Sequence, residues 1–306
     1  MGNRMDRTRR EFLRDMGLLA GGAAAVATSR MPVLAADAAA PDLVVVSGED
    51  VKALVRKAIA ELGGMGKFVS KGDVVVIKPN IGWDRRPEQA ANTHPDVVVA
   101  LIEMAADAGA KTIKVFDRSV EDPRRCYPAS GIPEAARKAG AKVLFPNELQ
   151  TAKIPIKNGV HLKESALWKD ALECDCYINV PIAKTHSGSQ LTMAMKNHMG
   201  LTADDRGFWH QSLDQAIADF SSGFKPKLNV LDAYRIVVRN GPQAGSLQDV
   251  KVVKKCIAGV NQASMDAYGT TLFGKQPMQI RHIALAAKLG VGEIDLAKLR
   301  IREVSA

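Results

Sequence analysis

Short runs of β-branched residues alternate with helical patterns along most of this 306-residue chain, and this alternation restricts the fold more than any other feature. The predicted strands are residues 43–46, 73–78, 112–116, 142–145, 176–180, 228–231 and 254–260. The predicted helices are residues 50–62, 94–108, 132–139, 190–199, 213–220, 263–273 and 279–289. Residues 118–131 are expected to form a long surface loop. The pattern predicts an α/β fold, with a mostly parallel sheet and helices on both faces, in a single domain.

The N-terminal segment has a different character. Residues 7–14 read Arg-Thr-Arg-Arg-Glu-Phe-Leu-Arg, and a mild apolar run diluted by glycines and a tract of small residues follow them. This order resembles the twin-arginine (Tat) export signal, whose translocon carries folded proteins. The apolar run is too short and too rich in glycine for a stable membrane span. The sequence thus predicts a signal over 1–35, a mature domain over 36–306 and a periplasmic location, with an ordinary basic N-terminus as the alternative.

Composition restricts the partners of the mature chain. The signal holds six of the 42 basic and three of the 33 acidic residues, so the mature chain keeps a net charge of about +6. Aromatic residues make up only 5% and no basic run reaches five residues, which argues against a nucleic-acid surface. The four cysteines form no Cys-x-x-Cys pair, so buried thiols or a disulfide are favoured over a metal or cluster site.

Polar side chains follow three predicted strands at the point where each strand ends. Lys78 and Asn80 follow the strand 73–78, and Lys184 and His186 follow the strand 176–180. Asp232 follows the strand 228–231. In open parallel sheets, ligands bind beyond the carboxyl ends of the strands. We therefore expect these side chains to meet in one crevice that takes a small anionic molecule.

The segment 184–210 is the densest in basic and titratable side chains. Its lysines can hold a phosphate or carboxylate, or act as bases if burial lowers the pKa of the lysine amine. Its histidines suit proton transfer or metal ligation. The helix predicted over 190–199 would also offer an anion its N-terminus, at Gly188 and Ser189. We assign catalytic roles to Lys184, His186 and Lys196, ligand binding to Lys78, Asn80, Asn197 and Arg206, and an optional divalent metal to His198, His210 and Asp232.

Several of these segments together resemble the domain of unknown function 362 family, over about residues 43–275. The matching motifs are Lys-Pro-Asn at 78–80, Thr-His-Pro at 93–95, Asn-Val-Pro-Ile-Ala-Lys-Thr-His at 179–186, Lys-Asn-x-x-Gly at 196–200, His210, the strand 228–233, Asn-Gly-Pro at 240–242, and Met-Asp-Ala-Tyr at 265–268. The resemblance implies no particular activity. Some family members look like iron–sulfur proteins with an extra ferredoxin-type segment, and its cysteine run is absent here, so the resemblance does not favour a cluster.

Two hypotheses of different classes follow. The first is an exported protein that binds a small anionic ligand or cofactor at the strand ends. A metal- or cofactor-dependent enzyme is one form of this hypothesis. The second is a non-catalytic periplasmic carrier of a metal or an iron–sulfur cluster. Two aspartates stay ambiguous: Asp117, next to Arg118, borders the same crevice or forms a surface salt bridge, and Asp266 is expected to cap its own helix. The sequence names no substrate, reaction or cofactor.

Overall fold

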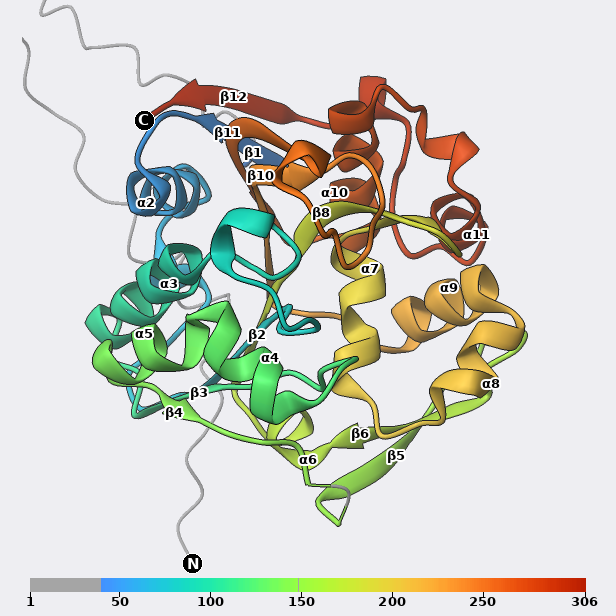
Figure 1. Cartoon of the computed structure of the whole chain (residues 1–306), viewed down its shortest axis with the longest axis horizontal. Coiled ribbons are helices and arrows are strands. Elements are labelled where there is room, and N and C mark those ends of the chain that lie inside the picture. Colours follow the sequence, from blue (N-terminus) through green and yellow to red (C-terminus); the bar gives the residue numbers. More distant parts are fainter. Residues whose placement is uncertain (1–39, 148) are drawn as a thin grey trace, which may run out of the picture. The chain divides into compact units, whose positions relative to one another are not determined.

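A ten-stranded sheet forms the centre of the domain (Figure 1). The computed structural model describes residues 40–147 and 149–306. The main path of the sheet runs β12-β1-β11-β10-β7-β2-β3-β4, and β8 joins β10 and carries β9. These strands are β1 (Leu43–Ser47), β2 (Val74–Pro79), β3 (Thr112–Val115), β4 (Lys142–Val143), β7 (Cys176–Val180), β8 (Ile182–His186), β9 (Gln190–Thr192), β10 (Leu228–Val237), β11 (Val250–Gly259) and β12 (Ile301–Ser305).

The direction of the strands is mostly parallel. β11 is antiparallel to both of its neighbours, and β9 is antiparallel to β8. All the other pairs in the ten-stranded sheet run parallel. A separate two-stranded antiparallel sheet consists of β5 (Thr151–Pro155) and β6 (Glu164–Trp168).

Helices cover both faces of the large sheet (Figure 1). They are α2 (Val51–Glu61), α3 (Pro95–Asp107), α4 (Pro123–Ser130), α5 (Ile132–Lys138), α6 (Lys169–Leu172), α7 (Ala194–Asn197), α8 (Arg206–Gln211), α9 (Leu213–Gly223), α10 (Gln262–Gly269) and α11 (Arg281–Lys288). α2, α3 and α5 contribute to one apolar cluster and α9, α10 and α11 to another. The described residues from Ala40 onward form one compact unit. The predicted fold class, a single α/β domain with a mostly parallel sheet, is confirmed.

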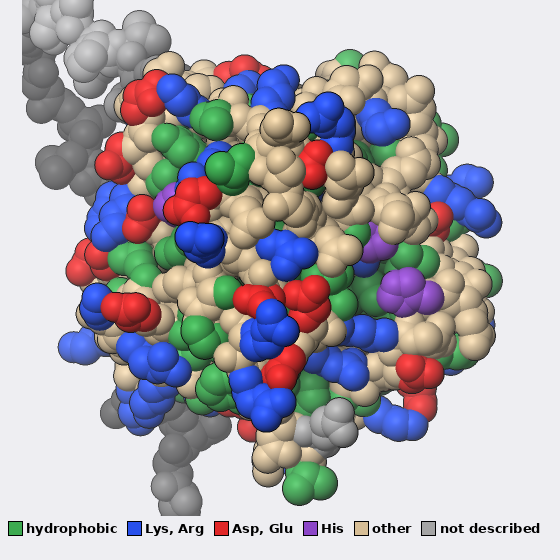
Figure 2. All heavy atoms as spheres, viewed as in Figure 1, with side chains coloured by type: hydrophobic (Ala, Val, Ile, Leu, Met, Phe, Trp, Pro, Cys, Tyr) green, Lys and Arg blue, Asp and Glu red, His purple; other side chains and the backbone are tan. Residues whose placement is uncertain are grey.

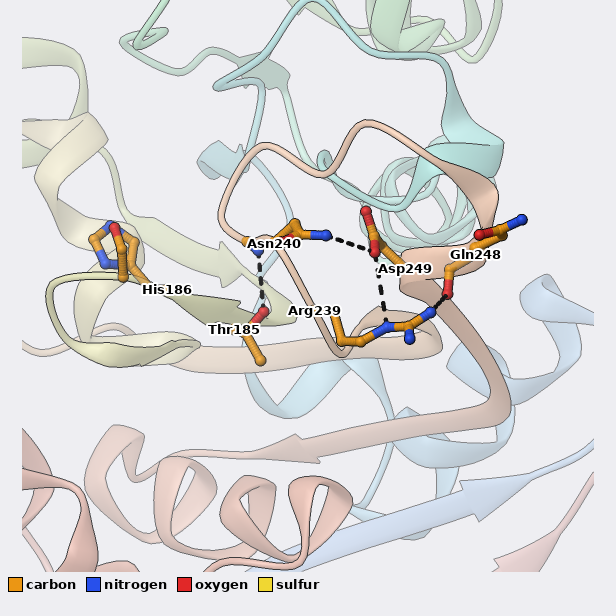
Figure 3. Close-up of a pocket in the computed structure, with 8 residues that line it drawn as sticks. Thr185, His186, Arg239, Asn240, Gln248 and Asp249 are labelled. Atoms are coloured by element: carbon orange, nitrogen blue, oxygen red, sulfur yellow. Dashed lines mark hydrogen bonds and ion pairs between the residues drawn. The ribbon is translucent and has the colours of Figure 1, made fainter.

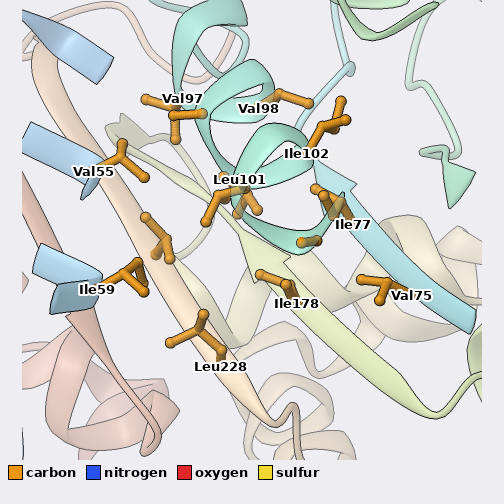
Figure 4. Close-up of a cluster of buried hydrophobic side chains, with 14 of the residues drawn as sticks. Val55, Ile59, Val75, Ile77, Val97, Val98, Leu101, Ile102, Ile178 and Leu228 are labelled. Carbon is orange, nitrogen blue, oxygen red and sulfur yellow. The ribbon is translucent and has the colours of Figure 1, made fainter. Parts of the chain in front are cut away.

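The two apolar clusters lie on opposite faces of the sheet because side chains alternate along a strand. In β1, Val44 and Val46 belong to the cluster with α2 and α3, whereas Leu43 and Val45 belong to the cluster with α9 and α10. Figure 4 shows how side chains of α3 meet those of β2 and β7 in the first cluster. Strands buried on both faces explain why the sequence shows them as continuous apolar runs rather than alternating ones.

Local signals set several helix ends as the sequence indicates. α2 begins after Asp50, whose carboxylate accepts a hydrogen bond of 2.7 Å from the backbone N–H of Ala53. α3 begins with Pro95 in its first turn, where a missing N–H does no harm, and His94 caps it. Both helices therefore begin within a residue of the predicted position.

The segment 190–199 departs most from the prediction. It is not one helix: residues 190–192 form β9 against β8, the four-residue α7 follows, and a 3-10 turn covers His198–Leu201. Its apolar residues are buried, as a helical spacing would suggest, but pairing with β8 holds the first three extended. Gly188 and Ser189 therefore do not begin a helix, and no helix N-terminus for an anion exists there.

Other differences concern strands and one loop. β8, β12 and the β5–β6 pair are absent from the predicted elements, and the predicted loop over 118–131 contains α4. β10 continues past Asp232 through an irregularity in its pairing with β11 between Ala233 and Arg235. The predicted Tat signal lies outside the described residues. Within residues 40–147 and 149–306, no helix has both the length and the apolar character needed to cross a membrane.

Candidate functional site: a pocket lined by cations

A cavity of about 380 Å³ lies beyond the carboxyl ends of β2 and β3, next to β8 and α7. Parallel strands bring their carboxyl ends to one edge, which is where ligands bind in open sheets. Eight of the ten residues predicted for the site line this cavity: Lys78, Asn80, Lys184, His186, Lys196, Asn197, Arg206 and His210. Figure 2 shows histidine and basic side chains near one another on one face, on the side of the molecule where α8 and α9 lie.

Lys78 is the most strongly bonded lysine of the pocket. Its ammonium lies 2.8 Å from the carboxylate of Asp117 and donates to the side-chain oxygen of Asn197 at 2.8 Å. It also donates to the backbone oxygen of Asn197. Burial lowers the pKa of Lys78, and the charge of Asp117 opposes that effect. Lys78 and Asp117 are 0% and 2% exposed, so this buried ion pair ties β2, β3 and α7 together.

Lys184 has weaker partners. Its ammonium donates to the backbone oxygen of Ala91 at 2.6 Å and to the side-chain oxygen of Asn80 at 3.1 Å. It also lies 6.0 Å from the centre of the Trp83 ring. The pKa of Lys184 is lowered to about 7, mainly by burial and then by the charge of the neighbouring Lys196, while the charge of Asp117 opposes both effects. Neutral oxygens thus hold this lysine without compensating its charge.

Lys196 has the poorest partner of the three lysines. Its ammonium lies 3.4 Å from the sulfur of Met199, a weak acceptor, and no oxygen of residues 40–147 or 149–306 accepts a hydrogen bond from it. The side chain is only 9% exposed. Burial lowers the pKa of Lys196 to about 7, with Arg206 and Lys78 adding to the effect and Asp214 opposing it. Lys196 is therefore a buried amine that lines a cavity and lacks a good acceptor.

Two more buried donors on the cavity wall lack a partner. The Nε of Arg206 and the hydroxyl of Thr192 make no hydrogen bond, although both residues line the cavity. One terminal nitrogen of Arg206 donates to the backbone oxygen of Arg118 at 2.6 Å, which fixes the guanidinium. Buried polar groups without a partner are uncommon, and those in a native structure require an explanation.

A chain of asparagines holds the floor of the pocket. Asn197 donates to Asn179 at 2.8 Å, and Asn179 donates to Asn229 at 2.9 Å. Asn80 donates to Asn197 at 3.2 Å. All four side chains lie among β2, β7, β10 and α7, so the network positions the C-terminal end of α7 against the strand ends.

Two residues that sequence reasoning did not assign to the site also position α7. Asp266 does not cap its own helix: its carboxylate accepts from the backbone N–H groups of Ala194 at 2.6 Å and Met195 at 3.0 Å. Burial raises the pKa of Asp266 to about 7. A Cβ at Gly200 would lie 1.8 Å from Asp117 and 2.7 Å from the ammonium of Lys78, so only glycine fits there. The glycine of the Lys-Asn-x-x-Gly string was the available signal for this close approach.

The two histidines of the pocket carry their protons on different ring nitrogens. Nδ1 of His186 accepts from the backbone N–H groups of Gly188 at 2.9 Å and Ser189 at 3.1 Å, so its proton is on Nε2. Nδ1 of His210 lies 2.6 Å from the backbone oxygen of Arg206, which only accepts, so Nδ1 carries the proton. Burial lowers the pKa of His186 to about 3, with the two nearby lysines adding to the effect. When both rings are neutral, Nε2 of His186 can donate a hydrogen bond and Nε2 of His210 can accept one.

The three residues predicted as metal ligands are not brought together. Nε2 of His198 bonds to Gln262 at 2.5 Å, and His198 does not line the cavity. Asp232 accepts from the backbone N–H groups of His94 at 2.8 Å and Tyr234 at 3.0 Å, and lies within β10 rather than beyond its end. Across residues 40–147 and 149–306, no three His, Cys, Asp or Glu side chains form a group that could hold a metal ion.

The cysteines and Asp117 differ from their other predicted roles. All four cysteines, at 126, 174, 176 and 256, are free thiols, and burial raises the pKa of each. A disulfide is thus not formed, and the buried-thiol alternative holds for three of them, while Cys174 is half-buried. Asp117 pairs with Lys78 and not with Arg118, whose guanidinium donates to the backbone oxygens of Thr202 and Asp204.

A second, more open depression adjoins the pocket at His186 (Figure 3). It has a volume of about 670 Å³ and is lined by Thr185, His186, Ser187, Arg239, Asn240, Gly241, Gln248 and Asp249. Asp249 accepts from Asn240 at 2.9 Å and lies 3.8 Å from Arg239, and none of the buried polar atoms without a partner in the described residues belongs to this wall. The depression therefore lacks the unpartnered donors of the deeper pocket.

The amino-acid sequence matches the profile of one protein family and is similar to one known protein. The profile of the family described as "Domain of unknown function (DUF362)" matches residues 75–271. "Thylakoid-associated protein sll1697" of Synechocystis sp. is 28% identical over 256 residues, which cover 78% of this chain and 75% of that protein.

Two solved structures are similar at low identity. The lactate racemase apoprotein from Thermoanaerobacterium thermosaccharolyticum aligns with a TM-score of 0.43 and 11% identity over 73% of this chain. The chain spans 55% of that protein's length. A protein from Thermotoga maritima aligns with a TM-score of 0.39 and 13% identity, covering 79% of this chain and 60% of its own. Since the family profile covers well over half of the sequence and includes the strand ends that build the pocket, the chain belongs to the domain of unknown function 362 family.

Proposed function

We propose that this protein binds a small anion with several acceptor oxygens, such as a phosphate, a phosphate ester or a dicarboxylate, in the cation-lined pocket. The observation that carries the proposal is the set of buried donors without an oxygen partner: Lys196, the Nε of Arg206 and the hydroxyl of Thr192. Leaving such groups unbonded destabilises a fold, because each loses its hydrogen bonds to water. An oxygen-rich anion would supply the missing acceptors.

The balance of charge supports the same ligand. Five basic side chains line the described wall of the pocket: Lys78, Lys184, Lys196, Arg118 and Arg206. The single acidic residue on that wall is Asp117, and it is already engaged by Lys78 and by the backbone N–H of Ile81 at 2.7 Å. Burial is the main cause of the low pKa values of Lys184 and Lys196, and neighbouring cations lower both values as well. An anion would raise both pKa values, so binding near neutral pH should take up protons.

The histidine pair supports chemistry beyond binding. His186 offers a proton at Nε2 and the neutral form of His210 offers a lone pair at Nε2, and both line the pocket. A donor and an acceptor at one site suit proton transfer to and from a bound substrate. We therefore propose that His210 accepts the proton in an acid–base reaction on the anion and that the neutral His186 donates a hydrogen bond to it. Lys184 and Lys196 are the groups that hold the anion.

Anion binding is tested by thermal unfolding with inorganic phosphate and with citrate, against sodium chloride of equal ionic strength. We expect a rise in the melting temperature of the wild type that grows with ligand concentration, because a ligand that binds only the folded state stabilises it. Lys196→Met keeps the shape of the side chain but removes the charge, and should reduce the shift strongly. Lys111→Met is the matched control: Lys111 is exposed and precedes β3, at the opposite edge of the sheet. Equal shifts in all three proteins would contradict the proposal.

The carrier alternative gains no support from this pocket. A metal or iron–sulfur cluster needs several thiolate, imidazole or carboxylate ligands, and the part of the chain that the structure describes offers no such group.

Export rests on the sequence of the N-terminal segment alone. We propose that the Tat translocon carries the folded protein to the periplasm. Replacing Arg9 and Arg10 by lysines should leave the precursor in the cytoplasm, as fractionation and immunoblotting would measure. Unchanged secretion of that variant would contradict the proposal.

A further inference from the structure

We propose that the amine of Lys196 is a nucleophile that forms an imine with a carbonyl group of the bound anion. The substrate class would then be an anionic carbonyl compound, such as a 2-oxo carboxylate or a phosphorylated aldehyde. This inference rests on the proposed function, since the anion must first bind in the pocket, and it adds a covalent step that anion binding alone does not require.

The three buried lysines of the pocket differ in a way that singles out Lys196. Lys78 forms an ion pair with the carboxylate of Asp117 and donates to two oxygens of Asn197. Lys184 is bonded to two neutral oxygens. Lys196 has only the sulfur of Met199 at 3.4 Å. A nucleophilic amine needs a free lone pair. A site that kept Lys196 protonated would surround its ammonium with oxygen acceptors, as the pocket does for Lys78.

The surroundings of Lys196 favour the neutral amine. A lysine becomes nucleophilic when it is desolvated or placed beside other cations, and Lys196 is both. With a pKa of about 7, roughly half of its molecules are neutral at pH 7, against about one in 2,500 for an exposed lysine. The charged and titratable groups that bear on it come from five elements: Lys78 of β2, His186 of β8, Arg206 of α8, Asp214 of α9 and His282 of α11.

The step balances with groups already in the pocket. The lone pair of the Lys196 nitrogen attacks the carbonyl carbon, and the C–N bond forms as the C=O electron pair moves to oxygen. Nε2 of His210 accepts a proton from the nitrogen and passes it to the oxygen, while the neutral His186 donates a hydrogen bond from Nε2 to that oxygen. The second proton of the amine reaches the hydroxyl by the same route, so the oxygen leaves as water. Loss of water from the resulting carbinolamine leaves the C=N bond, so no oxidant or reductant takes part.

The unpartnered donors fit the other end of such a substrate. Arg206 lies in α8 and Thr192 in β9, so they reach the cavity from elements other than α7. The Nε of Arg206 and the hydroxyl of Thr192 can bond the carboxylate or phosphate group, while the carbonyl group faces the amine of Lys196. The pocket then recognises the anionic group of the substrate, and the carbonyl group of the same substrate reacts with Lys196.

The experiment uses glyoxylate, the simplest anionic aldehyde, with sodium cyanoborohydride, which reduces an imine to a stable secondary amine. At pH 7 we expect peptide mass spectrometry to find the adduct on Lys196 at least about tenfold faster than on any exposed lysine, because far more of this amine is neutral. Lys184 has a similar pKa but donates to two oxygens, so it should react more slowly than Lys196. Phosphate should slow the reaction by competing for the same donors. Propanal, an uncharged aldehyde, should show a smaller preference for Lys196 than glyoxylate does, because it lacks the anionic group that Arg206 and Thr192 would bind.

Lys196→Arg separates the two proposals, because arginine keeps the charge but is not a nucleophile. This variant should keep the thermal shift with phosphate and lose the adduct. Lys184→Arg should keep the adduct, which checks that the loss is specific to position 196. If the wild type shows a phosphate shift but no preferential adduct on Lys196, the imine proposal is wrong and anion binding stands. If neither shift nor adduct is found, both proposals fail.

Discussion

Ile77 and Lys78 are neighbours in β2, both are 0% exposed, and their surroundings differ completely. Ile77 packs with Leu101 and Ile102 of α3 in an apolar cluster (Figure 4). Lys78 enters the opposite side of the sheet, among other cations and a chain of asparagines. One face of the strand end thus packs apolar side chains against a helix, while the other keeps buried charges and unpartnered donors.

The difference shows where the sequence serves stability and where it serves a ligand. Burying apolar side chains stabilises the fold, at about 25 cal/mol for each Å² removed from water. Burying an unpaired lysine does the opposite, because the charged form loses its hydration. Natural proteins keep such local conflicts mainly at functional sites. Substitutions in the apolar cluster should therefore lower stability and leave anion binding unchanged, while loss of the poorly partnered Lys196 should weaken anion binding without lowering stability.

The largest effect is expected for Lys78→Met. It would leave the carboxylate of Asp117 buried without its cation, and breaking a buried ion pair in this way destabilises by about 3–5 kcal/mol. Chemical denaturation of the variant measures the loss. Adding Asp117→Asn to Lys78→Met should restore part of it, because no unpaired carboxylate then remains. A variant as stable as the wild type would show that Lys78 is as dispensable for the fold as an unpaired pocket lysine.

Leu101→Ala tests the other side of the comparison. Leu101 is fully buried in the cluster of Figure 4, and removing most of its side chain should lower the free energy of unfolding by about 3 kcal/mol through lost transfer energy and a cavity. The shift in melting temperature with phosphate should stay that of the wild type, because α3 contributes no side chain to the pocket wall. Loss of that shift would mean that the two faces of β2 are coupled.

The same contrast explains which parts the sequence could predict. The run 73–78 is continuous and apolar, so its strand and the position of Lys78 at its end followed from local pattern. Convergence of Lys78, Lys184 and Lys196 followed from a general rule, since parallel strands end at one edge. The helix predicted over 190–199 failed because its apolar spacing fits a helix, while pairing with a distant strand decides the structure.

Pairings between distant residues lay beyond the sequence. Asp117 has Arg118 beside it in the chain, but packing puts Lys78 against its carboxylate. Asp232 was expected to end a strand, yet β10 continues and turns this carboxylate to the backbone of His94. Asp266 caps α7 from about 70 residues away. Neither composition nor spacing carries such information, because these contacts depend on how the finished elements pack.

The smallest effect is expected from pH, and it isolates the charge of Lys196. The pKa of Lys196 is about 7 in the folded chain and about 10.4 in an unfolded one, so the unfolded state binds more protons between these values. The free energy of unfolding of the wild type should therefore rise with pH through this window, because the penalty for the buried charge is complete below pH 7 and is relieved above it. Lys196→Met removes the penalty at every pH.

Denaturation of both proteins at pH 6 and pH 9 measures this difference. The advantage of Lys196→Met over the wild type should shrink by on the order of 2 kcal/mol from pH 6 to pH 9. Asp266 also titrates near pH 7, but it is present in both proteins and largely cancels in the comparison. Lys184 titrates there too, and the loss of Lys196 raises its pKa, which changes the difference in the same direction. Lys111→Met should differ from the wild type equally at both pH values. An advantage of Lys196→Met that does not change with pH would mean that Lys196 carries no buried charge, and the contrast between the two faces of β2 would then rest on Lys78 alone.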